Sequence, residues 1–152
     1  MAIGRGMPPP IQQLVRDYSD RLHHYGGVEL IEIPHAPQRT DTPEQVHRAL
    51  LWEKQRLLPY LVPEEPLILL DSGGEMLTSE QLAHRLEHYR AAGTQRLIFL
   101  IGGPNGCETS LCQGTRRLSL GPMTFPHLLV RVLLLEQLYR AFTILHGVPY
   151  HR

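Results

Sequence analysis

Cysteine is scarce in this chain of 152 residues, which contains only Cys107 and Cys112. Small secreted domains that rely on disulfides carry more, and these two positions lack the C-x-x-C spacing of a redox or metal-binding pair. We therefore expect both cysteines to be reduced packing residues of a cytoplasmic protein.

The chain also lacks an excess of charge of either sign. Lys and Arg total 15, Asp and Glu total 15, and the formal net charge is zero. Proteins that bind nucleic acid on their own are usually basic, so this composition argues against a free nucleic-acid binder. An RNA held mainly by its shape, inside an assembled particle, would require less positive charge.

No hydrophobic run is long and uninterrupted enough to predict a membrane span, and no segment has the pattern of a signal peptide. The longest apolar stretch lies near the C-terminus, where Arg131, Glu136 and Arg140 interrupt it. With 42% hydrophobic residues, the chain is expected to form one globular domain over residues 1–152, with a core of its own.

Strand-like and helix-like segments alternate along the chain, which predicts an α/β fold. Residues 28–33 have the pattern of a strand, and short apolar runs at 67–70 and 97–101 predict strands buried on both faces. Helices are expected after Pro10 and from two capping boxes, in which Thr42 and Thr78 are each followed three residues later by Gln.

The last thirty residues, 123–152, form a mostly apolar segment that predicts a long helix followed by a polar tail. Gly147 can end that helix, and Pro149 prevents its continuation. Tyr150, His151 and Arg152 then close the chain. Because chain ends are usually frayed and rarely carry such residues on an apolar stem, we expect the tail to dock into a site.

A glycine-rich loop, residues 102–106, directly follows the strand predicted at 97–101. In open α/β sheets, ligands bind at the carboxyl ends of strands, and glycine lets the backbone approach a ligand closely. The pattern is neither G-x-G-x-x-G nor a P-loop. Spacing alone therefore leaves two interpretations open, a ligand-binding loop and a tight turn.

Arg131 lies on the apolar side of the C-terminal helix, opposite the polar residues Glu136, Gln137 and Arg140. An arginine among apolar side chains must be paired or must bind something. The pattern leaves open a structural ion pair and a contact with an anion or substrate.

The glycine loop, the C-terminal helix and the Pro-Tyr-His-Arg ending together resemble the RlmH family, over residues 4–152. That family comprises small SPOUT-class methyltransferases that methylate N3 of a pseudouridine in large-subunit (23S) ribosomal RNA. The resemblance implies a mostly parallel sheet with flanking helices and a C-terminal trefoil knot. It also implies S-adenosylmethionine as cofactor, a homodimer and ribosomal RNA as partner, with no metal and no membrane.

The resemblance implies that three segments line the cofactor pocket. The matching positions here are Leu70, Gly102 and the run Leu120, Gly121, Pro122, Met123, Thr124 and Phe125. For catalysis we consider Arg131 and the tail, with His151 as a candidate base, Tyr150 against the target base and Arg152 on phosphate. Only three residues precede Gly4, where the family usually has a complete first strand, so we expect the sheet to be weakened there and the cofactor loops to be unaffected.

Other functions also have to be weighed. His84 and His88 belong to an H-x-x-E-H pattern that resembles an inverted zinc-protease motif, but helical geometry places both histidines on a polar face. A solvated helix face therefore explains them better than a metal site does. Two further alternatives are a non-catalytic module that binds nucleotide or RNA, and a SPOUT methyltransferase acting on transfer RNA.

Overall fold

The computed structural model describes residues 1–37 and 42–151. Over these residues the chain forms one five-stranded sheet in the order β2-β1-β4-β3-β5, in which the named strands pair in parallel. The strands are β1 (Ala2–Ile3), β2 (Glu32–Ile33), β3 (Leu67–Met76), β4 (Ile98–Ile101) and β5 (Arg116–Ser119). The predicted α/β fold with a mostly parallel sheet is confirmed, whereas the trefoil knot stays a prediction.

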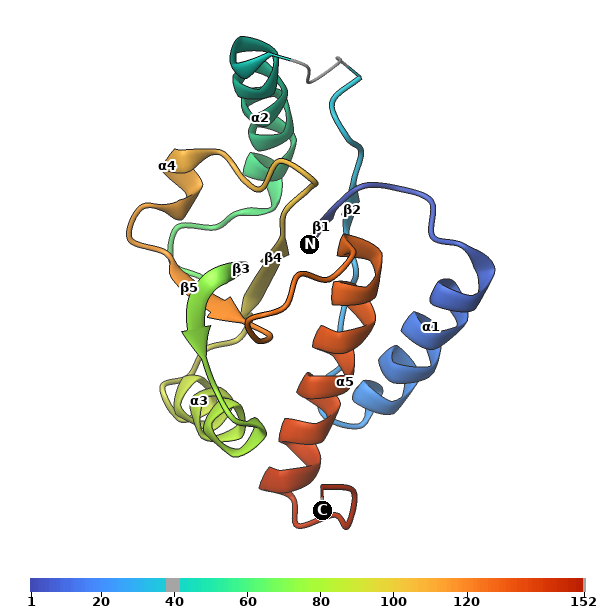
Figure 1. Cartoon of the computed structure of the whole chain (residues 1–152). Helices are drawn as coiled ribbons and strands as arrows, with labels where there is room; N and C mark the ends of the chain where they lie inside the picture. The colour runs from blue at the N-terminus through green and yellow to red at the C-terminus, as the bar shows by residue number, and fades with distance from the viewer. Residues whose placement is uncertain (38–41, 152) are drawn as a thin grey trace.

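Helices cover both faces of the sheet (Figure 1). The helices are α1 (Pro9–His23), α2 (Pro43–Leu57), α3 (Ser79–Ala91), α4 (Thr109–Cys112) and α5 (His127–Leu145), with a 3-10 turn η1 (Leu58–Tyr60) after α2. Helix α5 contacts α1 along one side and α3 along the other. No helix among the described residues is long and apolar enough to cross a membrane.

Both predicted capping boxes are present. The Thr42 side chain accepts a hydrogen bond from the Gln45 amide, and the Gln45 side chain accepts one from the Thr42 amide. Thr78 and Gln81 make the same reciprocal pair at the start of α3. Such pairs satisfy two amides that the first helical turn leaves without a partner, so the local sequence determines where each helix begins.

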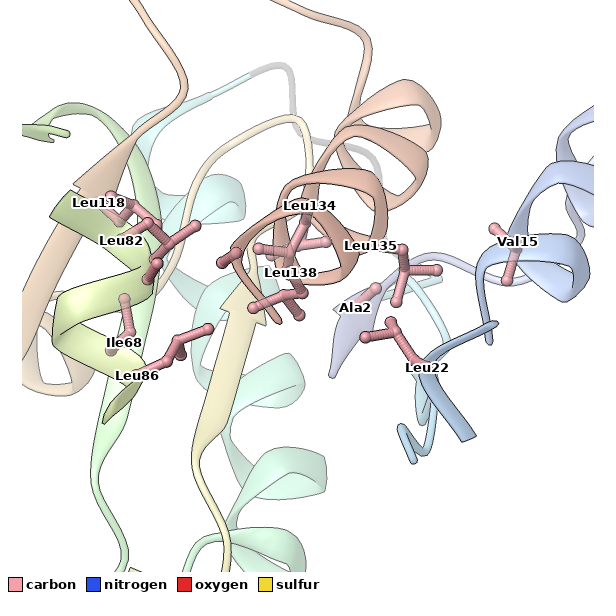
Figure 2. Close-up of a cluster of buried hydrophobic side chains, with 13 residues drawn as sticks. Ala2, Val15, Leu22, Ile68, Leu82, Leu86, Leu118, Leu134, Leu135 and Leu138 are labelled. Atoms are coloured by element: carbon pink, nitrogen blue, oxygen red, sulfur yellow. The ribbon is translucent and has the colours of Figure 1, made fainter. Parts of the chain in front are cut away.

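Successive strand residues point to opposite faces of the sheet, which divides the core into two clusters. On the face covered by α1, α3 and α5, strand residues such as Ala2 and Ile68 pack against the helices. Figure 2 shows Leu135 close to Ala2 and Leu22 on one side of α5. On the opposite face, Ile3 and Leu69 pack with Leu57 of α2. The sheet therefore buries apolar residues on both of its faces.

The predicted strand at 28–33 is shorter than expected. Only Glu32 and Ile33 form ladder pairs with the adjacent strand β1, which itself has just two residues, Ala2 and Ile3. Even so, both residues of β1 are at most 1% exposed, and the Met1 ammonium donates to the Phe99 carbonyl over 2.7 Å.

Strand β3 runs beyond the predicted 67–70 but changes register on the way. Leu70 and Glu75 both lie opposite Leu118 of β5, so residues 71–74 bulge out of the ladder. Gly74 lies where β3 rejoins the ladder after the bulge. A Cβ on this residue would come within 2.7–2.8 Å of the Arg117 and Leu118 backbone. Only glycine fits this close crossing, and the bulge turns residues 71 and 72 out of the ladder.

Candidate functional site

A cavity of about 600 Å³ opens beside the bulge of β3 and the carboxyl end of β4. Three chain segments form most of its walls: residues 69–72, where β3 enters its bulge; residues 101–107, from the last residue of β4 onward; and residues 118–127, from the end of β5 to the first residue of α5. Parallel strands bring these distant segments to one edge of the sheet, where open α/β folds bind their ligands.

Most residues predicted to bind the cofactor line this cavity. Those that do are Leu70, Gly102, Leu120, Gly121, Met123, Thr124 and Phe125. Pro122 belongs to the same segment but is not among the lining residues. The topology therefore brings the three predicted segments together, whereas their contact with a cofactor stays a prediction.

The glycine loop is held by its own backbone. Gly103 and Gly106 exchange hydrogen bonds of 3.2 and 2.9 Å across the loop. A Cβ on Gly102 would come within 2.9 Å of the Gly106 carbonyl and of the Cys107 sulfur. We expected glycine here to allow the close approach of a ligand. The structure shows instead that the close approach is to the loop itself.

A second turn forms the wall opposite the glycine loop. The buried Ser119 hydroxyl donates to the Gly121 carbonyl over 2.9 Å and accepts from the Gly121 amide over 3.2 Å. Residues 123–126, which we expected to be helical, belong to this wall instead. Helix α5 begins only at His127, because Pro126 occupies the position before its first turn.

Two titratable side chains missed by the sequence analysis line the cavity, Asp71 and His127. The Asp71 carboxylate accepts the Gly73 amide at 2.8 Å and lies 3.6 Å from Arg117 Nη1. The His127 ring stands edge-on to His35, with ring centroids 5.6 Å apart. Burial, together with the positive charge of Arg131, lowers the pKa of His127 below its ordinary value.

Both cysteines also line the cavity as free thiols. Burial, with smaller effects of nearby Cys112, Glu53 and Asp71, raises the pKa of Cys107 to about 12. Burial likewise raises the pKa of Cys112. The two thiols therefore stay protonated at neutral pH and are poor nucleophiles, which fits the expectation that they are packing residues.

Arg131 lies outside the lining of this cavity and is 1% exposed. Its Nη1 donates to Glu32 Oε1 over 2.5 Å, and its Nη2 donates to the carbonyls of Ile3 at 3.2 Å and Gly4 at 2.8 Å. Of the two alternatives for this residue, the structure shows the ion pair. Arg131 ties α5 to the ends of β1 and β2 beside the cavity.

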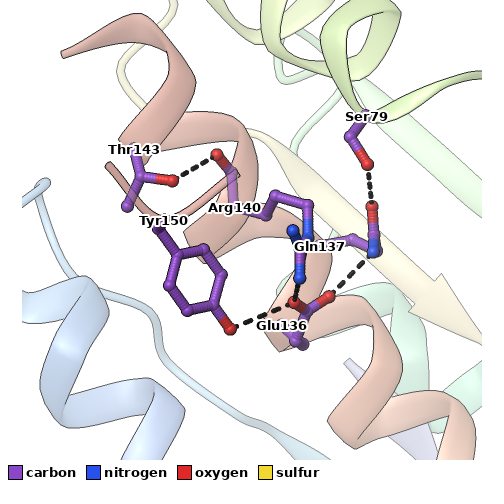
Figure 3. A network of polar contacts seen from close by, with 6 residues as sticks. All are labelled: Ser79, Glu136, Gln137, Arg140, Thr143 and Tyr150. Carbon is purple, nitrogen blue, oxygen red and sulfur yellow. Dashed lines mark hydrogen bonds and ion pairs between the residues drawn. The ribbon is translucent and has the colours of Figure 1, made fainter. Parts of the chain in front are cut away.

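The tail folds back along α5 of its own chain. Figure 3 shows the Tyr150 hydroxyl donating to Glu136 Oε1, over 3.2 Å. The Arg140 guanidinium pairs with the same carboxylate at 2.5 Å and lies 4.8 Å from the centroid of the Tyr150 ring. His151 Nε2 lies 2.7 Å from Glu80 on α3. Arg152 lies outside the described residues.

Within one chain, the tail and the cavity are therefore separate. Neither Tyr150 nor His151 is among the residues that line the cavity. Gly147 ends α5 as predicted, with a φ of 64° and with the Val148 amide donating to the Thr143 carbonyl. The tail of the single chain packs on α3 and α5 and not at the glycine loop, and its docking into a site stays a prediction.

The histidines of the zinc-like motif, His84 and His88, are both exposed on α3. No group of three or more His, Cys, Asp or Glu side chains that could hold a metal occurs among residues 1–37 and 42–151.

Comparison with known proteins agrees with this architecture. Residues 1–151 match the family model described as "Predicted SPOUT methyltransferase". The chain belongs to the SPOUT methyltransferase family. The cavity at the strand ends is thus the candidate active site of a methyltransferase.

The relatives bear names that agree with the resemblance found in the sequence. A protein of Magnetococcus marinus named ribosomal RNA large subunit methyltransferase H is 45% identical, over 100% of this chain and 96% of that protein. Proteins with the same name from Xylella fastidiosa strain M23 and Pelobacter propionicus are 41% and 39% identical, over 100% and 98% of this chain and 96% and 95% of theirs. The resemblance to the RlmH family is confirmed.

Proposed function

We propose that this protein transfers the methyl group of S-adenosylmethionine to N3 of a pseudouridine in large-subunit ribosomal RNA. The observation that carries the proposal is the cavity built by residues 69–72, 101–107 and 118–127, in a chain whose full-length relatives are named for ribosomal RNA methylation. Action on the ribosome places the protein in the cytoplasm.

The chemistry of the cavity fits this cofactor. Its volume lies within the range of about 300–1,000 Å³ that is usual for sites of small molecules and cofactors. Among the described lining residues there is no Lys or Arg, and the one acidic side chain is Asp71. A polyphosphate ligand would require cationic groups, whereas a positively charged sulfonium suits this lining.

When bound, S-adenosylmethionine supplies an activated methyl group, so the protein's task is orientation. The glycine loop and the turn at Ser119 and Gly121 fix the two facing walls of the cavity. Backbone hydrogen bonds between Gly103 and Gly106 hold one wall, and hydrogen bonds between the Ser119 hydroxyl and the Gly121 backbone hold the other. Arg131 has a positioning role, because it joins α5 to the strands beside the cavity.

The groups that contact the target base come from a second copy of the chain. Leu128, Leu129 and Leu133 lie near the start of α5 and belong to neither core cluster, and Leu129 is 40% exposed. Apolar residues left over on a helix that already packs on α1, α3 and the sheet favour a two-fold dimer. In the dimer, the tail of one chain completes the site of the other.

The tail then supplies the groups that meet the target base. Tyr150 stacks on the base or hydrogen-bonds to it, and Arg152 holds a phosphate. The N3 proton has to leave as the methyl group arrives, and we assign His151 as its acceptor. The Nδ1 atom of His151 is buried without a partner among the described residues, so this imidazole has a free hydrogen-bonding group.

Calorimetry with S-adenosylmethionine tests the cofactor first. We expect one site for each chain in the protein as purified. A protein that binds ribosomal RNA but no cofactor would favour the alternative of a non-catalytic RNA-binding module. Comparison of methyl transfer to ribosomes and to transfer RNA then separates the two SPOUT alternatives.

A further inference from the structure

Asp71 is the one acidic side chain among the described residues that line the cofactor cavity, and no Lys or Arg opposes it there. It follows Leu70, where β3 leaves the ladder, so the bulge in β3 brings the carboxylate to the cavity. A charge on the wall of a pocket with a largely apolar lining acts on every ligand that enters, because such a lining screens the charge less than bulk water does.

The carboxylate is held in place from two sides. Oδ1 accepts the Gly73 amide over 2.8 Å, and Oδ2 lies 3.6 Å from Arg117 Nη1 on the neighbouring strand β5. The Arg117 side chain is 50% exposed and the Asp71 side chain 31%. Arg117 therefore neutralises the carboxylate only in part, from the solvent side.

Cys107 and Cys112 line the same cavity as free thiols. Burial is the largest cause of the raised pKa of each thiol, and the negative charge of Asp71 adds a smaller effect in the same direction. The lining has one other titratable group besides these, His127, whose lowered pKa leaves its imidazole uncharged at neutral pH.

We propose that Asp71 is a specificity residue that makes the cavity prefer the cationic methyl donor over the neutral product left after transfer. This inference rests on the proposed function. S-adenosylmethionine carries a sulfonium, an ammonium and a carboxylate, so its net charge is +1. S-adenosylhomocysteine keeps only the ammonium and the carboxylate, so its net charge is zero.

The charge changes during the reaction itself. The bond between sulfur and the methyl carbon breaks, and its electron pair stays on sulfur as a neutral thioether. The electron pair on the base nitrogen forms the new bond to the methyl carbon, and the proton of that nitrogen passes to His151, the acceptor assigned above. A negative wall therefore attracts the donor more than the product, which limits product inhibition and promotes exchange.

The test compares the affinities of the two ligands by calorimetry in a matched set of variants. Asp71→Asn removes the charge but keeps an oxygen that can accept the Gly73 amide. We expect the preference for S-adenosylmethionine over S-adenosylhomocysteine to fall about three- to tenfold in this variant, as for loss of one partly screened charge. Arg117→Gln removes the neutralising partner, and we expect the preference to rise.

Asp20→Asn is the control, because it changes the net charge equally on α1, outside the cavity lining. It should leave the preference unchanged. An unchanged preference in Asp71→Asn, or an equal loss of affinity for both ligands, would overturn the proposal while leaving the proposed function intact. If the unsubstituted protein binds neither ligand, the proposed cofactor is wrong and this inference fails with it.

Discussion

Tyr150 donates a hydrogen bond to Glu136 in the middle of α5, whereas His127 in the first turn of the same helix lines the cavity. At 1.5 Å per residue, the two positions on α5 are about 13 Å apart along its axis. This separation is why the tail and the cofactor cavity of one chain do not form a single site, and why the proposed function requires a second chain.

Removal of residues 150–152 should leave the dimer intact and abolish methyl transfer. Sedimentation velocity measures the first property and radiolabelled methyl incorporation the second. Mixing provides the sharper test. The truncated chain and a Gly102→Val chain, whose glycine loop is disrupted, are each expected to be inactive.

Heterodimers of these two chains contain one intact cavity facing one intact tail. Activity should therefore return on mixing, to a fraction of the level of the unsubstituted protein. Full activity of the truncated chain alone would contradict the role of the tail. Absence of recovery, with heterodimers demonstrated, would contradict the completion of one site by two chains.

The dimer is predicted to depend on the apolar start of α5. Leu129→Asp places a charge on a residue that is 40% exposed and outside both core clusters, so the monomer should still fold. We expect sedimentation to show a monomer at micromolar concentration. Val62→Asp is the control, because Val62 is also 40% exposed but lies outside α5, and this variant should remain dimeric. Dimers in both variants would locate the interface elsewhere.

Arg131→Met should destabilise the fold by about 3–5 kcal/mol, because it leaves the Glu32 carboxylate and two carbonyls without their donor. Urea unfolding measures this loss. Arg90→Ala is a suitable comparison, since its pair with Glu87 is exposed at the surface and should contribute less than about 1 kcal/mol. Similar effects of the two substitutions would argue against a structural role for Arg131.

The lowered pKa of His127 predicts a pH dependence of stability. Just below pH 6.5, the ordinary pKa of histidine, His127 becomes protonated in the unfolded chain but stays unprotonated in the folded chain. The free energy of unfolding should therefore fall as the pH drops below 6.5, until the folded state also becomes protonated. His127→Gln should remove this contribution, so the difference between the two proteins should vary with pH in that window. A constant difference from pH 5 to 8 would contradict the assignment.

Local signals predicted much of the fold. The Thr-x-x-Gln pairs at 42 and 78 correctly predicted the starts of α2 and α3, and the apolar runs at 67–70 and 97–101 predicted the first part of β3 and the whole of β4. Strand β5 was missed, because its first residues, Arg116 and Arg117, are exposed and lack an apolar pattern. The register of β3 against β5 depends on contacts between distant segments, which periodicity does not reveal.

The cavity was predicted through resemblance more than through residue patterns. Asp71 was missed, although its place directly after a buried strand was a usable signal. His127 was missed because a single histidine at a helix start has no distinctive spacing. Whether Arg131 was paired or bound a ligand could not be decided from the sequence, since Glu32 lies 99 residues away along the chain.

The central claim is tested most directly by incubating the protein with methyl-labelled S-adenosylmethionine and large ribosomal subunits that lack the modification. We expect about one methyl group per subunit, located by mass spectrometry on N3 of a pseudouridine, with transfer RNA remaining unlabelled. Label in transfer RNA, on another nucleotide, or in neither RNA despite cofactor binding would contradict the account.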